Sequence, residues 1–256
     1  MALTLNRRQL LQGTGVAVAA AAMSPLMQSA AFAAPPGITA YGGSVCYGLG
    51  LGKNPPPDST WFAQTALNLG LDPGLQEDIP TPTAINGAIP GTVLRSCIDE
   101  QAKHPERDTW GQFFWGGHAD VNKGLGPKVL RNIRTLVNKY PLAPYLILGI
   151  TNGESGGIGT AYYDEVFTPV TGINAQLAAK YKGRFFDVQA FLIDLGPTGA
   201  MAAANLPITA ADQQCVDEGR VPISLRAAQA DVHLNLSGQT AVAGKTTPLA
   251  RTLFGF

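Results

Sequence analysis

Residues 144–150 read Pro-Tyr-Leu-Ile-Leu-Gly-Ile, an almost unbroken apolar run. A strand that is covered on both faces has this composition, because neither of its alternating sets of side chains meets water. Strands of this kind occur almost only in parallel sheets that carry helices on both sides. The stretch therefore predicts an α/β domain built around a central parallel sheet.

The segments around this strand alternate between strand and helix patterns. Further short strands are expected at residues 37–41, 113–115 and 184–188, and apolar residues recur at helical spacing within 61–69, 92–103, 129–137, 173–178 and 238–253. Asp58 or Ser59 is the expected cap of the first of these helices, and Thr92 is the expected cap of the second. The alternation predicts a three-layer αβα sandwich with a parallel sheet in the middle.

The N-terminal 33 residues have the pattern of a cleavable export signal. Arg7 and Arg8 are followed by leucines, a weakly apolar stretch covers residues 15–23, and Ala31-Phe32-Ala33 has the form of a cleavage site. No acidic residue precedes Ala34. The pattern predicts a twin-arginine signal peptide over residues 1–33, export by the Tat machinery to the periplasm or beyond, and a mature domain at 34–256.

The alternative for this segment is an N-terminal membrane anchor. A spanning helix needs about 20 consecutive apolar residues. Here the run is broken by Gln12-Gly13 and by Ser24-Pro25, which favours cleavage. Because no later segment is long and apolar enough to span a bilayer, we expect no stable membrane insertion after cleavage.

Composition narrows the class of partner. The 256-residue chain holds 18 basic and 18 acidic residues. Removal of residues 1–33 takes away Arg7 and Arg8 and no acid, which leaves a net charge of −2. Because the sequence has no basic stripe, nucleic acid is not an expected partner. With 45% hydrophobic residues and abundant glycine and proline, we expect a compact core with many loops.

The three cysteines, Cys46, Cys97 and Cys215, leave one thiol over if two of them pair. Cys97 and Cys215 could form a disulfide in an oxidising compartment. Alternatively, Cys97 is a core residue, because it shares a helical face with neighbouring apolar side chains. The spacing of the three does not resemble a metal site, and we expect neither a metal nor a cofactor.

Several turns are expected to follow strand ends at one edge of the sheet. Ligands of open α/β sheets bind at this edge, beyond the carboxyl ends of the strands. These turns lie around Ser44, at residues 86–91 and at residues 117–120, and a fourth segment, 231–235, contains His233. Together they would bring a serine, backbone amides and a histidine to one rim. The glycines at 48–52 do not make a phosphate loop, since their spacing is Gly-x-Gly-x-Gly and Asn54 follows Lys53.

These four segments, in this order, resemble the motif blocks of the SGNH (GDSL-like) hydrolase family. The family's first block, Gly-Asp-Ser-x-x-x-Gly, corresponds to Gly42–Gly48, and Asn-x-Gly-x-x-Gly corresponds to Asn86–Gly91. Gly-x-Asn-Asp corresponds to Gly117–Asp120, and Asp-x-x-His corresponds to Ala230–His233. The resemblance covers nearly all of the mature chain and implies the flavodoxin-like fold of that family.

The resemblance also implies residue roles. Ser44 would be the nucleophile, His233 its general base and Asp231 the residue that orients the histidine. The backbone N–H groups of Ser44 and Ala88 would bind the oxyanion, and His118 is a candidate side-chain donor. The expected activity is hydrolysis of a small-molecule or glycan ester.

The sequence departs from the family pattern at four positions. Gly43 replaces the first-block aspartate, and Ala119 replaces the third-block asparagine that donates to the oxyanion. Ala230 stands where the family has its aspartate, so that Asp231 lies two residues before His233 and not three. Ala88 replaces a glycine but keeps its amide.

Each candidate has a plainer interpretation, and the function has alternatives. Ser44 could cap its turn locally, and His233 or His118 could be rim histidines. Cys46 is a rival nucleophile or, as we favour, a buried small residue, and His104 lies in a charged loop where solvation is expected. The departures allow a binding module that has lost catalysis, and exported members of the family suggest acyl transfer to a glycan as a third possibility.

Overall fold

The computed structural model describes residues 34–74, 83–152, 163–227 and 232–256, which all belong to one compact unit. The predicted signal peptide, residues 1–33, lies outside the described residues. Five parallel strands form a single sheet in the order β2-β1-β3-β4-β5. In chain order, the strands are β1 (Ile38–Gly42), β2 (Ala84–Asn86), β3 (Gly111–Trp115), β4 (Tyr145–Leu148) and β5 (Phe185–Phe186).

This strand order is the flavodoxin-like one, as the sequence predicts. The chain steps from β1 to β2 on one side and then crosses to β3 on the other side of β1. Gly42 at the end of β1 pairs with Trp115 at the end of β3. Because the direction of winding reverses between these two strands, the crevice beyond their carboxyl ends is where a ligand site is expected.

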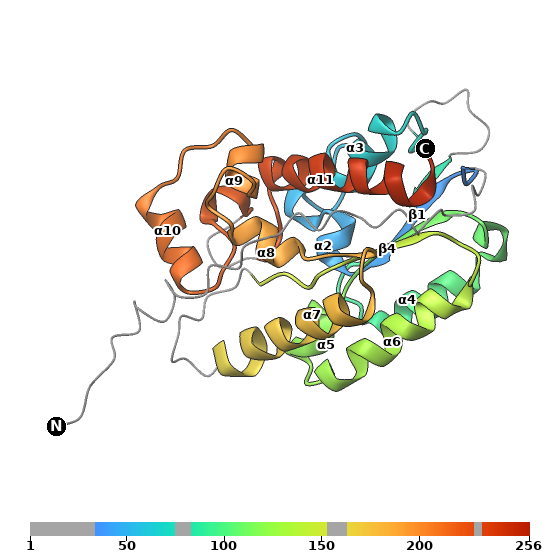
Figure 1. Cartoon of the computed structure of the whole chain (residues 1–256), viewed down its shortest axis with the longest axis horizontal. Coiled ribbons are helices and arrows are strands. Elements are labelled where there is room, and N and C mark those ends of the chain that lie inside the picture. The colour runs from blue at the N-terminus through green and yellow to red at the C-terminus, as the bar shows by residue number, and fades with distance from the viewer. Residues whose placement is uncertain (1–33, 75–82, 153–162, 228–231) are drawn as a thin grey trace. The chain divides into compact units, whose positions relative to one another are not determined.

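Helices cover both faces of the sheet (Figure 1). One layer contains the short helix α2 (Ser44–Tyr47), α3 (Trp61–Asn68), α8 (Val188–Ile193), α9 (Ala200–Ala203) and the long C-terminal helix α11 (Leu236–Phe254). The other layer contains α4 (Leu94–Ala102), α5 (His118–Asn122), α6 (Gly126–Lys139) and α7 (Thr168–Lys180). Helix α10 (Ala210–Asp217) packs on the 3₁₀ turn Ile223–Leu225.

The alternation of side chains along the central strands supplies the two halves of the core. Phe113 and Trp115 point into the α3–α11 layer, whereas Phe114 between them points into the α4–α6 layer. Leu146 and Ile147 divide in the same way along β4. All of these side chains are buried, which explains why residues 144–150 show no polar alternation.

The structure confirms the predicted sandwich and corrects several local details. Helix α3 is capped by Thr60, whose hydroxyl accepts the Ala63 amide, and not by Asp58 or Ser59. Helix α4 begins at Leu94, whose amide donates to the side chain of Asp120 at 2.9 Å, so Thr92 is not its cap. Strand β2 was not predicted, because its three residues are too few to show a periodic pattern.

All three cysteines are free and buried. Cys97 lies in the core cluster of the α4–α6 layer, as the core alternative expects, while the Cys215 sulfur accepts a hydrogen bond from Arg226 at 3.3 Å. The predicted alternative of a Cys97–Cys215 disulfide is therefore not formed. Among the described residues, no cluster of three or more histidine, cysteine or acidic side chains could hold a metal ion, and no helix has the length and apolarity to cross a membrane.

Candidate active site

Ser44 and His233 meet at the carboxyl end of β1. Ser44 Oγ lies 2.7 Å from His233 Nε2, although 189 positions separate the two residues in the chain. Ser44 is the first residue of α2, two positions after β1 ends, and His233 precedes α11 by three positions. Both side chains are half-buried. A serine hydroxyl within hydrogen-bond distance of an imidazole is the arrangement that general-base activation of a nucleophile requires.

The backbone that carries His233 is held on both sides. Leu234 forms an antiparallel bridge with Arg226, and the Ala227 amide donates to the His233 carbonyl at 2.9 Å. The Asn235 side-chain amide donates to the carbonyls of Ser224 and Arg226, at 2.9 and 3.1 Å. These contacts leave the histidine backbone little freedom to move away from Ser44.

Asn235 also starts the helix that follows. Its side-chain oxygen accepts the Gly238 amide at 3.1 Å and caps α11. One side chain therefore joins the 224–226 segment to the beginning of α11, with His233 two residues away. The role of Asn235 could not be predicted from the Leu-Asn pair after His233, because its clamp needs a segment about ten residues upstream.

Gly50 packs directly against the histidine. A Cβ at this position would lie 2.2 Å from the Leu234 carbonyl oxygen and 3.1 Å from the His233 Cβ. Only a residue without a side chain lets the 3₁₀ turn Leu49–Leu51 approach that closely. One glycine of the run after Ser44, which does not fit a phosphate loop, thus packs against His233.

The predicted triad acid is not among the described residues. Asp231, with Ala230, lies outside the described residues, so its role as the residue that orients His233 stays a prediction. The described part of the site is a serine–histidine pair held by backbone contacts.

The Ala88 amide, a predicted oxyanion donor, lies beside β1 but already has an acceptor. The neighbouring Gly87 and Ile89 amides donate to the Ala40 and Gly42 carbonyls at the end of β1. The Ala88 amide donates to the side-chain oxygen of Asn86 at 3.1 Å. To bind an oxyanion, this amide would have to share its hydrogen with Asn86 or exchange one acceptor for the other.

His118, the candidate side-chain donor, is the first residue of α5 and has contacts at both ring nitrogens. Nδ1 lies 3.1 Å from the Thr151 carbonyl oxygen, so it must be protonated to donate there. Nε2 lies 3.1 Å from the side-chain nitrogen of Asn122 and acts as an acceptor in a neutral ring. The oxyanion role of His118 stays a prediction, and it would require this ring to change partners.

The rival nucleophile Cys46 is fully buried in the α3–α11 layer. Burial raises the pKa of its thiol well above the usual value, so the thiolate that nucleophilic chemistry needs is suppressed. Cys46 instead offers its carbonyl oxygen to the Trp61 ring N–H at 2.9 Å and to the Asn86 side chain at 3.3 Å. This agrees with the interpretation of Cys46 as a buried small residue.

His104 lies elsewhere and is not simply solvated. Its two ring nitrogens lie 3.0 Å from Glu106 Oε1 and 3.2 Å from Glu100 Oε1. The expectation of a solvated histidine is therefore corrected, because this ring sits between two carboxylates at the C-terminal end of α4. It takes no part in the site.

A cavity of about 330 Å³ lies between the end of α2, the start of α3 and β2, and neither Ser44 nor His233 is part of its wall. Tyr47, which ends α2, and Asn86, which accepts the Ala88 amide, belong to its wall, with Phe62 and the prolines of residues 55–57. The wall is thus mostly apolar with a few polar groups, the usual composition of a site for a small organic group.

No family model and no curated protein matches the sequence. Solved structures do match the fold. A GDSL-like lipase from Bacteroides thetaiotaomicron superposes with a TM-score of 0.52 at 12% identity, over 88% of this chain and 94% of that one. A catalytic mutant of an acetylxylan esterase from Geobacillus stearothermophilus gives 0.52 at 15% identity, over 88% and 97%.

A member of the lipolytic G-D-S-L family from Veillonella parvula gives a TM-score of 0.51 at 16% identity, over 85% of this chain and 97% of that one. At identities this low the likeness shows a shared fold. The chain therefore has the α/β sandwich found in GDSL-type lipases and esterases.

Proposed function

We propose that this protein is an exported serine ester hydrolase of the SGNH type, in which Ser44 is the nucleophile and His233 the general base. The observation that supports this most is the 2.7 Å separation between Ser44 Oγ and His233 Nε2 at the winding reversal of the sheet. The shared fold with GDSL-type lipases and esterases points in the same direction.

The proposed reaction has two halves. As Ser44 Oγ attacks the ester carbonyl carbon, its proton passes to His233 Nε2, and the carbonyl oxygen becomes an oxyanion. The tetrahedral intermediate then expels the alcohol, which takes the proton from His233, and an acyl-serine remains. Water attacks this acyl group with His233 again as base, and the carboxylic acid and free Ser44 are released.

The oxyanion would be bound by the backbone N–H groups of Ser44 and Ala88, with His118 as a candidate third donor. The Ala88 amide would have to leave the Asn86 oxygen at least in part. Ala119 provides no side-chain donor where the family has asparagine. The loss of one such donor typically costs about 3 kcal/mol, or 10² to 10³ in rate, so we expect slow turnover compared with enzymes that hold the full set.

The cavity at Tyr47 and Asn86, which begins three residues along α2 from Ser44, would hold the acyl or the alcohol group. Its volume of about 330 Å³ is at the lower end of the range for small-molecule sites. We therefore expect short acyl esters to be better substrates than long-chain lipids. With Asp231 as orienter the site is a triad, and without it the site is a dyad.

Labelling by a fluorophosphonate tests the nucleophile. The full chain should be labelled, the Ser44→Ala variant should not, and Ser96→Ala, a matched change on α4, should be labelled like the wild type. Labelling that persists in Ser44→Ala, or that never occurs in folded protein, would refute the proposal. Product analysis with a glycan acceptor present would then separate hydrolysis from acyl transfer.

A second function is favoured by two particular observations. Ala119 lacks the donor amide, and the Ala88 amide is engaged by Asn86. Both would suit a binding module that keeps the fold and has lost turnover. Measurable hydrolysis of short p-nitrophenyl esters that disappears in Ser44→Ala would exclude this alternative.

Export by the Tat route follows from residues 1–33 and is part of the proposal. Replacement of Arg7 and Arg8 by lysine should retain the protein, unprocessed, in the cytoplasm of a Tat-competent host. Equal export of both forms would argue against this route.

A further inference from the structure

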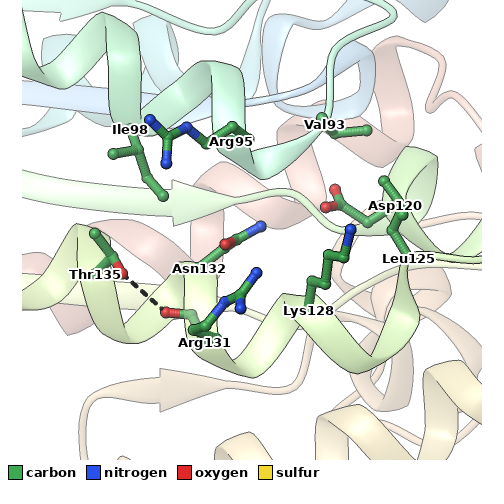
Figure 2. Close-up of a pocket in the computed structure, with 9 residues that line it drawn as sticks. All are labelled: Val93, Arg95, Ile98, Asp120, Leu125, Lys128, Arg131, Asn132 and Thr135. Atoms are coloured by element: carbon green, nitrogen blue, oxygen red, sulfur yellow. Dashed lines mark hydrogen bonds between the residues drawn. The ribbon is translucent and has the colours of Figure 1, made fainter.

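A second concave surface lies on the other layer of the sandwich, away from α11. It is a groove of about 540 Å³ between α4 and α6, shown in Figure 2. The volume is well within the range of small-molecule sites. The proposed hydrolase reaction makes no use of it.

The rim of the groove is positive. Arg95 comes from α4, and Lys128 and Arg131 come from α6. Arg95 is paired with Asp99 at 3.2 Å, but within the described residues neither Lys128 nor Arg131 forms an ion pair. These two cations are exposed and available to a ligand.

The positive charge is not offset along the chain. Between Asp120 and Glu154 the sequence contains no acidic residue, while exposed cations stand at Lys123, Lys128, Arg131, Arg134 and Lys139. In a chain with equal numbers of acidic and basic residues, this segregation makes one face locally attractive to anions. Two of the five cations line the groove.

The inner end of the groove carries a buried carboxylate. Asp120 is 1% exposed, and Figure 2 shows its side chain directed into the space between α4 and α6. One carboxylate oxygen accepts the Leu94 amide at 2.9 Å, and the other has no hydrogen-bond partner. A buried acceptor without a donor is costly, so a ligand that brings a hydroxyl group to this oxygen gains binding energy.

The rest of the lining is mixed. Val93, Ile98 and Leu125 supply apolar contacts, and Asn132 is a mostly buried amide at the groove. The groove therefore combines cations at the rim, an acceptor without a donor at its inner end, and apolar walls. Inorganic phosphate could pair with the cations and donate a hydroxyl proton to Asp120, but it has no ring to lie on the apolar walls.

We propose that the α4–α6 groove binds an acidic sugar, that is, a hydroxyl-rich ring with a carboxylate or phosphate group. The anionic group pairs with Lys128 and Arg131, a ring hydroxyl donates to Asp120, and the C–H faces of the ring lie on the apolar walls. A flat anionic membrane is less suitable, because it would contact the exposed cations but would not reach the buried carboxylate.

The test uses the full chain and measures binding, so it does not depend on esterase activity. Trigalacturonate is titrated while backbone amide signals are followed by NMR, with maltotriose and inorganic phosphate as comparison ligands. The Leu94 amide should shift with trigalacturonate, because it donates to Asp120. Maltotriose and phosphate should bind at least about tenfold more weakly.

A matched pair of variants separates the groove from the general charge of α6. The Lys128→Ala/Arg131→Ala double variant should weaken trigalacturonate binding roughly tenfold or more. Arg134→Ala/Lys139→Ala removes the same charge from the same helix outside the groove and should change binding less than about twofold.

Three results would overturn the proposal. The first is no trigalacturonate binding up to roughly 10 mM, the range of very weak affinity. The second is equal weakening by both double variants, which would mean diffuse electrostatic attraction, as expected for anionic lipid vesicles. The third is phosphate binding as tight as trigalacturonate binding, which would leave the sugar ring and the apolar walls without a role.

Discussion

Gly50 packs against His233, so closely that a Cβ on Gly50 would lie 3.1 Å from the Cβ of His233. The same Cβ would lie 2.2 Å from the Leu234 carbonyl oxygen, a contact that the backbone must move to relieve. We predict that Gly50→Ala displaces His233 from Ser44 and lowers kcat at least about tenfold, because small misplacements of a catalytic group are costly.

Gly52 provides the matched control for this change. A Cβ there would meet nothing within 4 Å. The φ of Gly52 is 107°, a value that residues with a side chain rarely adopt, whereas the φ of Gly50 is not positive. Because φ 107° with ψ 175° is a conformation that essentially only glycine adopts, Gly52→Ala should lower stability by about 1–3 kcal/mol and leave the kcat of the folded protein within about twofold. If Gly50→Ala keeps full activity, the turn at residues 49–51 has no part in placing the histidine.

The second prediction concerns the serine–histidine pair itself. If Ser44 and His233 act as one unit, Ser44→Ala, His233→Ala and the double variant should lose similar amounts of activity, because removal of either partner already abolishes the step. Hydrolysis rates for a short p-nitrophenyl ester measure this. Losses that multiply in the double variant would show that the two residues act independently.

The third prediction concerns the missing oxyanion donor. Ala119 is the second residue of α5 and half-exposed, so an asparagine can be accommodated there without disturbing the core. Ala119→Asn should raise kcat by about 10² if the side chain reaches the oxyanion. Ala119→Leu, which adds bulk without a donor, serves as the control. An unchanged rate in Ala119→Asn would mean that this helix does not face the reacting carbonyl.

The fourth prediction is a pH dependence of stability. Asp212 is fully buried at the start of α10. Burial raises the pKa of its carboxyl, but hydrogen bonds from Ser224 and Thr209 outweigh this and hold the pKa below the usual value. A lowered pKa in the folded state adds stability above the unfolded-state value, and this stability is lost as the pH falls through the folded-state value.

The Asp212→Asn variant measures this contribution. By urea unfolding it should be less stable than the wild type by about 1–2 kcal/mol at pH 6, and the difference should shrink below about pH 4. Asp217→Asn, an exposed change on the same helix, should show no such trend. A stability difference that grows as the pH falls would mean that folding raises the pKa of Asp212.

The fifth prediction concerns the thiols. Burial raises the pKa of Cys97 to about 12, and none of the three cysteines is bonded to another. In the native protein a thiol reagent should therefore react slowly, and in denaturant it should titrate three thiols per chain. Addition of a reductant should leave Tm unchanged. Recovery of only one thiol in denaturant would show that two of the cysteines do pair.

Much of this architecture could be predicted from the sequence. The apolar run at residues 144–150 indicates a strand covered on both faces, because its composition reports burial directly. That Ser44 and His233 meet is what the resemblance to the SGNH motif blocks implies. The rule that parallel strands direct their following turns to one edge accounts for Ser44, which follows β1, but not for His233, which follows no strand of the sheet. The composition of a strand reports its burial, and the connectivity of a parallel sheet fixes the edge at which the turns after its strands lie.

The tertiary structure alone decided the contacts that hold the site. Asp120 rather than Thr92 satisfies the first amide of α4, Asn235 clamps a segment about ten residues upstream, and Gly50 meets His233 from the opposite end of the chain. These contacts depend on which distant residues the packing brings within reach. The separation of Cys97 from Cys215 has the same origin, since the fold places each sulfur in its own buried environment.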